Sequence, residues 1–226
     1  KLFAAYGVYG CRVFEINSGK LIQNFELNHV RLAEFSSNNK QLLTVNLFDS
    51  VSVKLFDLDD GQESLVFQGF EKELSAHFAT FGPNSKTILV VRDSSAIMFD
   101  AGTGSQIKTF QSGAESIRLA AFSPNGNFIL LASARIGGNV FVYDANSTEL
   151  LYVLDKHEWY INQALFSPDG KLILTASGNT LRAFDLNTGK LEYSRSDHTA
   201  NIGSINFNPE GDLFITAFEH DATPYD

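Results

Sequence analysis

A short phrase that recurs along the chain constrains its fold more than any other feature. The phrase is Phe-Ser-Pro-Asp-Gly-Lys or a close variant of it, followed by an apolar run. Successive copies begin 46, 41, 44 and 41 residues apart. A period of this size indicates a repeat architecture in which every repeat is one supersecondary unit. The copies begin at Phe35, Phe81, Phe122, Phe166 and Phe207.

A second marker, an aromatic residue followed by an acidic one, keeps the same period. Its steps are 42, 43, 44 and 41 residues, and a polar turn such as Asn187-Thr188-Gly189-Lys190 follows most copies. Because two independent phrases share one period, chance does not explain the repetition. The pairs are Phe14-Glu15, Phe56-Asp57, Phe99-Asp100, Tyr143-Asp144 and Phe184-Asp185.

Each unit has the pattern of short strands. Residues 161–166 alternate between two faces, and residues 129–132 form a continuous apolar run that suits a strand buried on both faces. Pro-Asn-Gly and Pro-Asp-Gly supply tight turns, because Pro presets its own backbone angle and Gly tolerates positive φ. No long segment has apolar residues at helical spacing. The sequence predicts an all-β protein with four antiparallel strands per unit.

This order of strands and turns resembles the WD-repeat family of β-propellers, and its best copy runs from Lys156 to Asp185. The resemblance implies a β-propeller of four-stranded antiparallel blades arranged radially. The strands of a blade are called a to d from the centre outwards. The marker phenylalanine then ends strand a, and the aromatic-acidic pair ends strand c.

The resemblance also implies a polar network that this chain cannot complete. In the family, a His before strand a, a hydroxyl on strand b, an Asp in the b–c turn and the Trp of strand c are hydrogen-bonded. His157 and His198 lie nine residues before their marker phenylalanines, and Thr175 or Ser177 offers the hydroxyl. Phe184, followed by Asp185, holds the Trp position, and Phe has no N–H to donate. We therefore expect apolar packing to hold the blades together.

The strand count predicts how the chain is divided. We expect one propeller domain, or a fragment of one, across residues 1–226, with 21 strands that begin and end within a blade. We favour a stretch of a larger, seven-bladed ring, although a five-bladed ring closed by the last strand a, with one strand left over, is also open. The expected units are a partial blade 1–27, blades 28–69, 70–112, 113–155 and 156–196, and a partial blade 197–226.

Composition restricts the partners and the compartment. The net charge is −9, and no Lys/Arg run interleaved with aromatics is present, so we expect no direct nucleic-acid binding. An acidic chain favours basic peptide segments through long-range attraction. The single cysteine, Cys11, fits a reducing compartment, and no apolar run reaches the roughly 18 residues of a membrane span. We expect an intracellular protein of the cytoplasm or nucleus, without a membrane span.

Motifs for catalysis are missing from the sequence. It contains no Walker-type loop, no Gly-x-Ser-x-Gly elbow and no His-Glu-x-x-His, and its five histidines are scattered. We expect no catalytic residues, no metal and no cofactor, and therefore no enzyme. The alternative is a propeller-type enzyme, resembling a lactonase or hydrolase, with a metal or polar site in the central channel.

The resemblance implies a non-enzymatic scaffold that binds proteins or peptides and assembles a multiprotein complex. In the family, the d–a and b–c turns share one face and often carry the contacts. Trp159, the only tryptophan, and its neighbour Tyr160 have the composition of an interface hot spot, unless both rings lie against the neighbouring blade. A further alternative is an architectural segment of a larger subunit in transport, cilia, ribosome assembly or chromatin. The expected contact residues are Trp159, Tyr160, Glu158, Arg135 and Asp93, with Ile136, Glu71, Lys72 and Glu73 on the same face.

Overall fold

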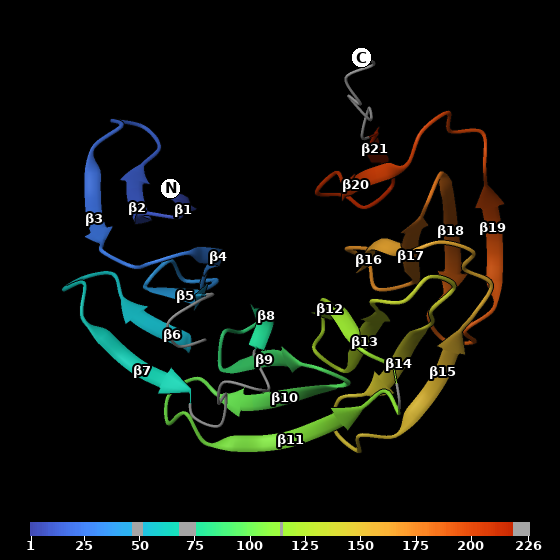
Figure 1. The fold of residues 1–226 in the computed structure, drawn as a ribbon, viewed down its shortest axis with the longest axis horizontal. Coiled ribbons are helices and arrows are strands. Elements are labelled where there is room, and N and C mark those ends of the chain that lie inside the picture. Colours follow the sequence, from blue (N-terminus) through green and yellow to red (C-terminus); the bar gives the residue numbers. More distant parts are fainter. Residues whose placement is uncertain (47–51, 68–75, 114, 219–226) are drawn as a thin grey trace, which may run out of the picture. The chain divides into compact units, whose positions relative to one another are not determined.

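All regular elements of the described chain are β-strands (Figure 1). The computed structural model describes residues 1–46, 52–67, 76–113 and 115–218. These residues form 21 strands in six antiparallel sheets, and in each sheet the strands are adjacent in sequence order. The predicted all-β fold of four-stranded antiparallel propeller blades is thereby confirmed. The number of blades in the ring and a single domain across residues 1–226 stay predictions.

Four sheets are complete, one has three strands and one has two. The first contains β1 (Leu2–Gly7), β2 (Gly10–Glu15) and β3 (Leu21–Phe25). The second contains β4 (Val30–Phe35), β5 (Gln41–Asn46), β6 (Ser52–Asp57) and β7 (Glu63–Phe67), and the third β8 (Ala76–Phe81), β9 (Thr87–Arg92), β10 (Ser95–Asp100) and β11 (Gln106–Gln111). The fourth contains β12 (Ile117–Phe122), β13 (Phe128–Ser133), β14 (Val140–Asp144) and β15 (Leu150–Leu154). The fifth contains β16 (Ile161–Phe166), β17 (Leu172–Ser177), β18 (Thr180–Asp185) and β19 (Leu191–Arg195), and the last β20 (Ile202–Phe207) and β21 (Phe214–Phe218).

The recurring Ser-Pro phrase forms the turn between strands a and b. The buried hydroxyl of Ser167 donates to Asp169 Oδ1 at 2.6 Å and accepts the Leu172 N–H at 2.9 Å. Gly170 has a φ of +68°, which costs a glycine little. In the last copy Asn208 replaces the serine, and its Oδ1 accepts the N–H groups that close the turn.

The acidic residue of the second marker closes the turn between strands c and d. Asp185 Oδ1 accepts both the backbone N–H and the hydroxyl of Thr188, each at 2.8 Å. Asp100 makes the same pair of bonds to Thr103, and they hold the pKa of this exposed carboxyl below its usual value. Asp144 does the same with Ser147. The aspartate therefore recurs because its side chain replaces missing backbone acceptors in a tight turn.

The chain divides into two compact units, residues 1–111 and 112–226. In the first unit, apolar clusters join the first sheet to the second and the second sheet to the third. In the second unit, corresponding clusters join the fourth sheet to the fifth and the fifth sheet to the last. Within each unit the core therefore lies between the faces of consecutive sheets.

In three places, a side chain on strand d of one sheet lies on a glycine in the c–d turn of the following sheet. Tyr152 on β15 covers Gly189, where an added Cβ would lie 2.6 Å from the ring, and the Tyr152 hydroxyl donates to the Asn187 carbonyl. Gln23 covers Gly61 and Leu65 covers Gly104 in the same way in the first unit. These glycines are needed both for positive φ and for the approach of the neighbouring side chain.

One polar contact joins two strands a in the first unit, and it predicts a pH effect. Thr80 Oγ1 on β8 donates to Glu34 Oε1 on β4 at 3.3 Å, and burial raises the pKa of Glu34 from 4.5 to about 7. Because the pKa of Glu34 is higher in the folded state than in the unfolded state, its protonation stabilises the fold fully below about pH 4.5, and this stabilisation is lost as the pH rises through 7.

We expect Glu34→Gln to raise the thermal midpoint at pH 8 and to change it little at pH 5. Circular dichroism at both values, with exposed Glu26→Gln as control, checks this; an equal shift at both pH values contradicts it.

Candidate functional site

Two histidines lie where the family resemblance placed them, each bonded to a threonine of its own sheet. The buried His157 ring has its Nε2 2.9 Å from Thr175 Oγ1 on β17. In the last sheet, His198 Nε2 lies 3.2 Å from Thr216 Oγ1 on β21. Both pairs tie the loop before strand a to strand b of the same sheet.

The electrostatics of the His157 site favour a neutral imidazole. Burial lowers the pKa of His157 to about 4, and the guanidinium of Arg182 acts in the same direction. The ring centroid of Phe184 lies 6.0 Å from that of His157, in the position that tryptophan holds in the family. Phe184 is buried and presents only carbon, so this side of the imidazole is apolar. We therefore expect His157 to have a structural role.

Ser177, the other candidate for the hydroxyl, bonds the loop backbone instead. Its Oγ accepts the N–H of Trp159 at 3.2 Å and donates to the Trp159 carbonyl at 2.9 Å. Ser177 and Thr175 are two residues apart on β17 and therefore share a face. One strand thus holds the loop at two points, at its histidine and at its tryptophan.

The indole of Trp159 lies against the β17–β18 turn of its own sheet and stays 57% exposed. A Cβ on Gly178, whose φ is +57°, would come within 2.7 Å of Trp159 Cδ1, so the indole contacts this glycine directly. Tyr160 is 46% exposed. The alternative in which the tryptophan is covered by a neighbouring sheet does not describe this arrangement.

The β13–β14 turn of the preceding sheet lies next to this loop. A Cβ on Gly137 would be 3.4 Å from the His157 carbonyl oxygen, and the preceding Ile136 is 59% exposed. Arg135 and Glu158 are also exposed. Glu158 partly offsets the effect of burial, which lowers the pKa of Arg182. The Trp159 patch is defined here as Arg135, Ile136, Glu158, Trp159 and Tyr160.

Four of the expected contact residues are not among those of the Trp159 patch: Asp93, Glu71, Lys72 and Glu73. Asp93 is exposed in the β9–β10 turn of the first unit, with a φ of +52°. Glu71, Lys72 and Glu73 lie outside the described residues. Of the five contact residues expected from the sequence, Arg135, Glu158, Trp159 and Tyr160 lie on two neighbouring turns of the second unit, and their role in binding stays a prediction.

Sequence reasoning missed an exposed apolar turn in the first unit. Tyr9, in the β1–β2 turn, is 97% exposed, and Tyr6 and Val8 beside it are about half exposed. They border a hollow of about 360 Å³ that Arg12 also lines. The signal was present in the sequence, because Gly7 and Gly10 flank Val8 and Tyr9 and indicate a tight turn that exposes these two side chains.

Two further searches concern catalysis and membranes. Within residues 1–46, 52–67, 76–113 and 115–218, no three His, Cys, Asp or Glu side chains are grouped closely enough to bind a metal ion. The same residues contain no helix with the length and apolar character needed to cross a membrane.

Comparison with known proteins gives a family and one relative. Autophagy-related protein 18 of Dictyostelium discoideum is 29% identical over 104 residues, which are 45% of this chain and 28% of that protein. The chain therefore covers well under a third of this relative. The family model of eukaryotic translation initiation factor eIF2A matches residues 50–180, more than half of the chain. With its four-stranded antiparallel blades and this match, the chain belongs to the eIF2A family.

Proposed function

We propose that this chain is a non-enzymatic interaction module that uses the Trp159 patch to bind a protein partner within a multiprotein complex. The observation that carries the proposal is the exposed indole of Trp159, which lies against Gly178 while the Ser177 hydroxyl holds the Trp159 backbone. Tryptophan, tyrosine and arginine are enriched among residues that dominate binding energy. The patch offers all three, with the aliphatic Ile136 beside them.

The rigidity of the loop supports this role. The Trp159 backbone is fixed by two hydrogen bonds to Ser177. Two positions earlier, the contact of His157 with Thr175 anchors the same loop. An interface side chain that is already ordered loses less conformational entropy when a partner binds. A loop held on a stiff sheet is also the usual place for binding residues.

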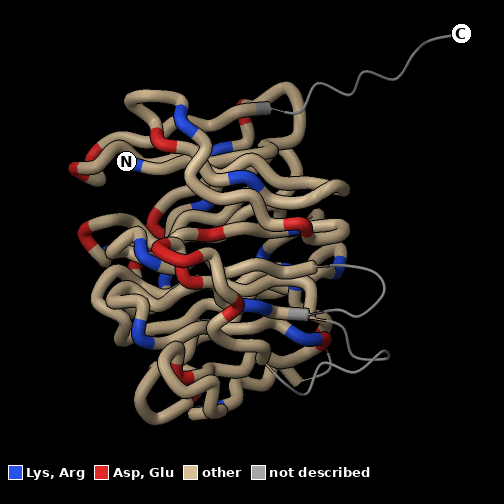
Figure 2. The backbone as a smooth tube through the Cα atoms, turned by 90° about the vertical axis from the view of Figure 1, so that its left-hand side faces the viewer, with Lys and Arg blue, Asp and Glu red and all other residues tan. Residues whose placement is uncertain are grey.

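The charge of the second unit supports a basic segment as the part of the partner that contacts this chain. The second unit contains seven Lys and Arg against fourteen Asp and Glu, so most of the net charge of −9 lies in the unit that carries the Trp159 patch. Figure 2 shows basic and acidic residues intermingled along the backbone. An acidic field accelerates encounter with a basic partner and selects against acidic ones.

The family match supports a setting for the module. Its description names a translation initiation factor, and we propose that the partner belongs to the machinery of translation initiation. The role is one of assembly: the chain presents a surface, and the reaction chemistry resides elsewhere in the complex. This setting is intracellular.

Replacing Trp159 by alanine tests the proposal. We expect Trp159→Ala to weaken partner capture about 30-fold, the effect of losing an interface hot spot. The chain is immobilised at a series of concentrations and incubated with a cell extract. Quantitative mass spectrometry of the retained proteins then measures how strongly the partner is captured. Leu150→Ala, which truncates an exposed apolar residue of β15, is the matched control.

Circular dichroism must accompany the capture experiment. Because the indole is more than half exposed, Trp159→Ala should leave the thermal midpoint close to that of the wild type. Equal capture by Trp159→Ala and the wild type contradicts the proposal. So does a large fall in the thermal midpoint with partner capture unchanged.

A further inference from the structure

Arg182 on β18 is a buried cation in the fifth sheet. Of the Lys, Arg, Asp and Glu residues that the structure describes, it alone is buried, with 8% of its surface exposed. Its Nη1 has no hydrogen-bond partner within the described chain. Burying a cation is unfavourable unless an anion or hydrogen-bond acceptors compensate for the lost hydration. Packing alone therefore does not explain why an arginine occupies this position.

Two other sheets carry a cation at the same position of strand c, and both provide a partner for it on strand d. The position is the third residue before the acidic residue of the second marker. In the first sheet, Arg12 Nε donates to Asn24 Oδ1 at 3.1 Å. In the second sheet, Lys54 Nζ lies 2.6 Å from Glu63 Oε2. Each of these sheets satisfies its own cation.

Strand β19 offers Arg182 no equivalent partner. Ser194 lies opposite Arg182, where β3 has Asn24. Leu191 takes the place that Glu63 holds on β7. Neither residue has a carboxylate or an amide oxygen, although the register between strands c and d is the same. The fifth sheet has thus kept the cation and lost its partner.

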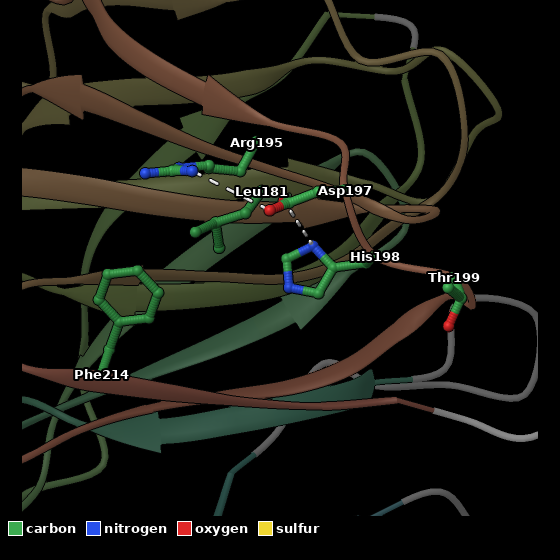
Figure 3. A pocket seen from close by; sticks show the side chains of 6 residues that line it. All are labelled: Leu181, Arg195, Asp197, His198, Thr199 and Phe214. Carbon is green, nitrogen blue, oxygen red and sulfur yellow. Dashed lines mark ion pairs between the residues drawn. The ribbon is translucent and has the colours of Figure 1, made fainter.

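The other arginine of this sheet shows the ordinary arrangement. Arg195 on β19 lines a hollow, its side chain is 68% exposed, and its Nη1 lies 4.0 Å from Asp197 Oδ2 (Figure 3). A hydrated surface pair of this kind contributes little to stability and leaves no charge uncompensated. The contrast shows that burial without a partner is particular to Arg182.

The guanidinium of Arg182 lies close to the loop that carries the Trp159 patch. Arg182 is in register with Thr175 on β17, and Thr175 contacts His157 of that loop at 2.9 Å. The charge of Arg182 acts on His157, and the carboxylate of Glu158 acts on Arg182. The cation is therefore within electrostatic reach of a ligand on the patch.

The face of β18 that carries Arg182 is covered by the chain's own fourth sheet. Arg182 and Phe184 are two residues apart on this strand and share a face. Phe184 packs with Leu154 of the fourth sheet. Both sheets lie within the described residues of the second unit, so the surroundings of Arg182 come from strands that are present.

We propose that Arg182 binds a carboxylate of the partner segment that the Trp159 patch recognises, an inference that rests on the proposed function. A guanidinium and a carboxylate form two parallel hydrogen bonds, which fix the orientation of a ligand as well as matching its charge. The segment is basic overall and carries one Asp or Glu. Its carboxylate neutralises Arg182, while a neighbouring Lys or Arg pairs with the exposed Glu158. Opposite charges side by side on both surfaces set the register of binding and discriminate against segments that are only basic.

A site of this kind lowers the stability of the free chain. Replacing an unpaired buried charge by an apolar side chain of similar volume is neutral or stabilising. We therefore expect Arg182→Met to raise the thermal midpoint of the free chain, measured by circular dichroism. An arginine retained for packing alone would give a fall in the midpoint.

Two heptapeptides of lysine with blocked ends are the probes, one with a central Glu and one with a central Gln. We expect the Glu peptide to bind the wild-type chain about 10-fold more tightly, the effect of a hydrogen bond between charged groups. Titrations followed by the fluorescence of Trp159, the only tryptophan, measure both affinities at the patch itself. Arg182→Met should bind the two peptides equally, and Arg182→Lys should keep part of the preference. Lys171→Met, which removes an exposed cation from the same sheet, should keep all of it.

Several outcomes overturn the proposal. They are equal affinity of the wild type for both peptides, no binding up to about 1 mM peptide, or an unchanged preference in Arg182→Met. An unchanged preference with a lower thermal midpoint assigns Arg182 a purely structural role. Capture from an extract that depends on Trp159, with both peptides binding equally, rejects the inference about Arg182 and leaves the proposed function standing.

Discussion

Replacing Phe184 by alanine is expected to lower the free energy of unfolding of the second unit by about 3–5 kcal/mol. Phe184 is buried in the cluster that joins the fourth and fifth sheets, where it packs with Leu154 and Val142. Truncation removes a large apolar side chain from a site whose surrounding strands cannot collapse far. The loss therefore includes the transfer free energy of the ring and the cost of the remaining cavity.

Trp159 makes this measurement specific to one unit. It is the only tryptophan, and it lies in the second unit beside Ser177. Urea unfolding followed by tryptophan fluorescence reports on the sheet that contains Phe184. Phe184→Leu, which keeps most of the volume, should lose much less stability. A loss below about 1 kcal/mol for Phe184→Ala contradicts the packing described for this residue.

Acidification is expected to remove about 3 kcal/mol from the second unit through His157 alone. The pKa of the buried His157 is lowered to about 4 in the folded state, from an ordinary value of 6.5. Between these values the unfolded chain binds a proton that the folded chain does not. The stability is therefore complete above about pH 6.5, falls as the pH decreases, and reaches its lower level near pH 4.

His157→Gln isolates this effect. Its amide keeps a polar group near Thr175 but does not titrate, so the difference in unfolding free energy between variant and wild type should change with pH. Urea unfolding at pH 7, 6, 5 and 4 measures that difference. The comparison is needed because Glu34 in the first unit has a raised pKa and acts in the opposite direction over an overlapping range. A difference that is constant with pH contradicts a buried, neutral His157.

Strand positions were predictable because two signals agreed at every unit. The turn phrase and the aromatic-acidic pair mark the strand ends, and the residues that the structure describes form the 21 strands that these markers predict. The role of Asp185 can be understood from the local sequence, because its bonds to Thr188 are made within four residues.

Contacts of loops with strands and of one sheet with the next were less predictable, because they join residues that are at least 18 positions apart in the examples below. That Thr175, and not Ser177, contacts His157 depends on how the preceding loop crosses β17, which alternation along the strand does not determine. The contact of Tyr152 with Gly189 likewise depends on how two sheets pack. Arg195 was visible in the sequence, but only the strand register shows that it occupies the strand d position that Phe25, Phe67 and Leu154 hold in their own sheets.

The Ser-Pro dipeptides of the repeat have a consequence for phosphorylation. Proline-directed kinases act on Ser-Pro, so Ser123 and Ser167 resemble modification sites when only the sequence is read. In the folded chain both hydroxyls are buried and bonded, Ser123 to Asn125 and Ser167 to Asp169. A phosphate there would place about two negative charges in a turn built around the hydroxyl. These serines are therefore substrates only while a sheet is unfolded, and phosphate found on them in cells would mark chains that had not completed folding.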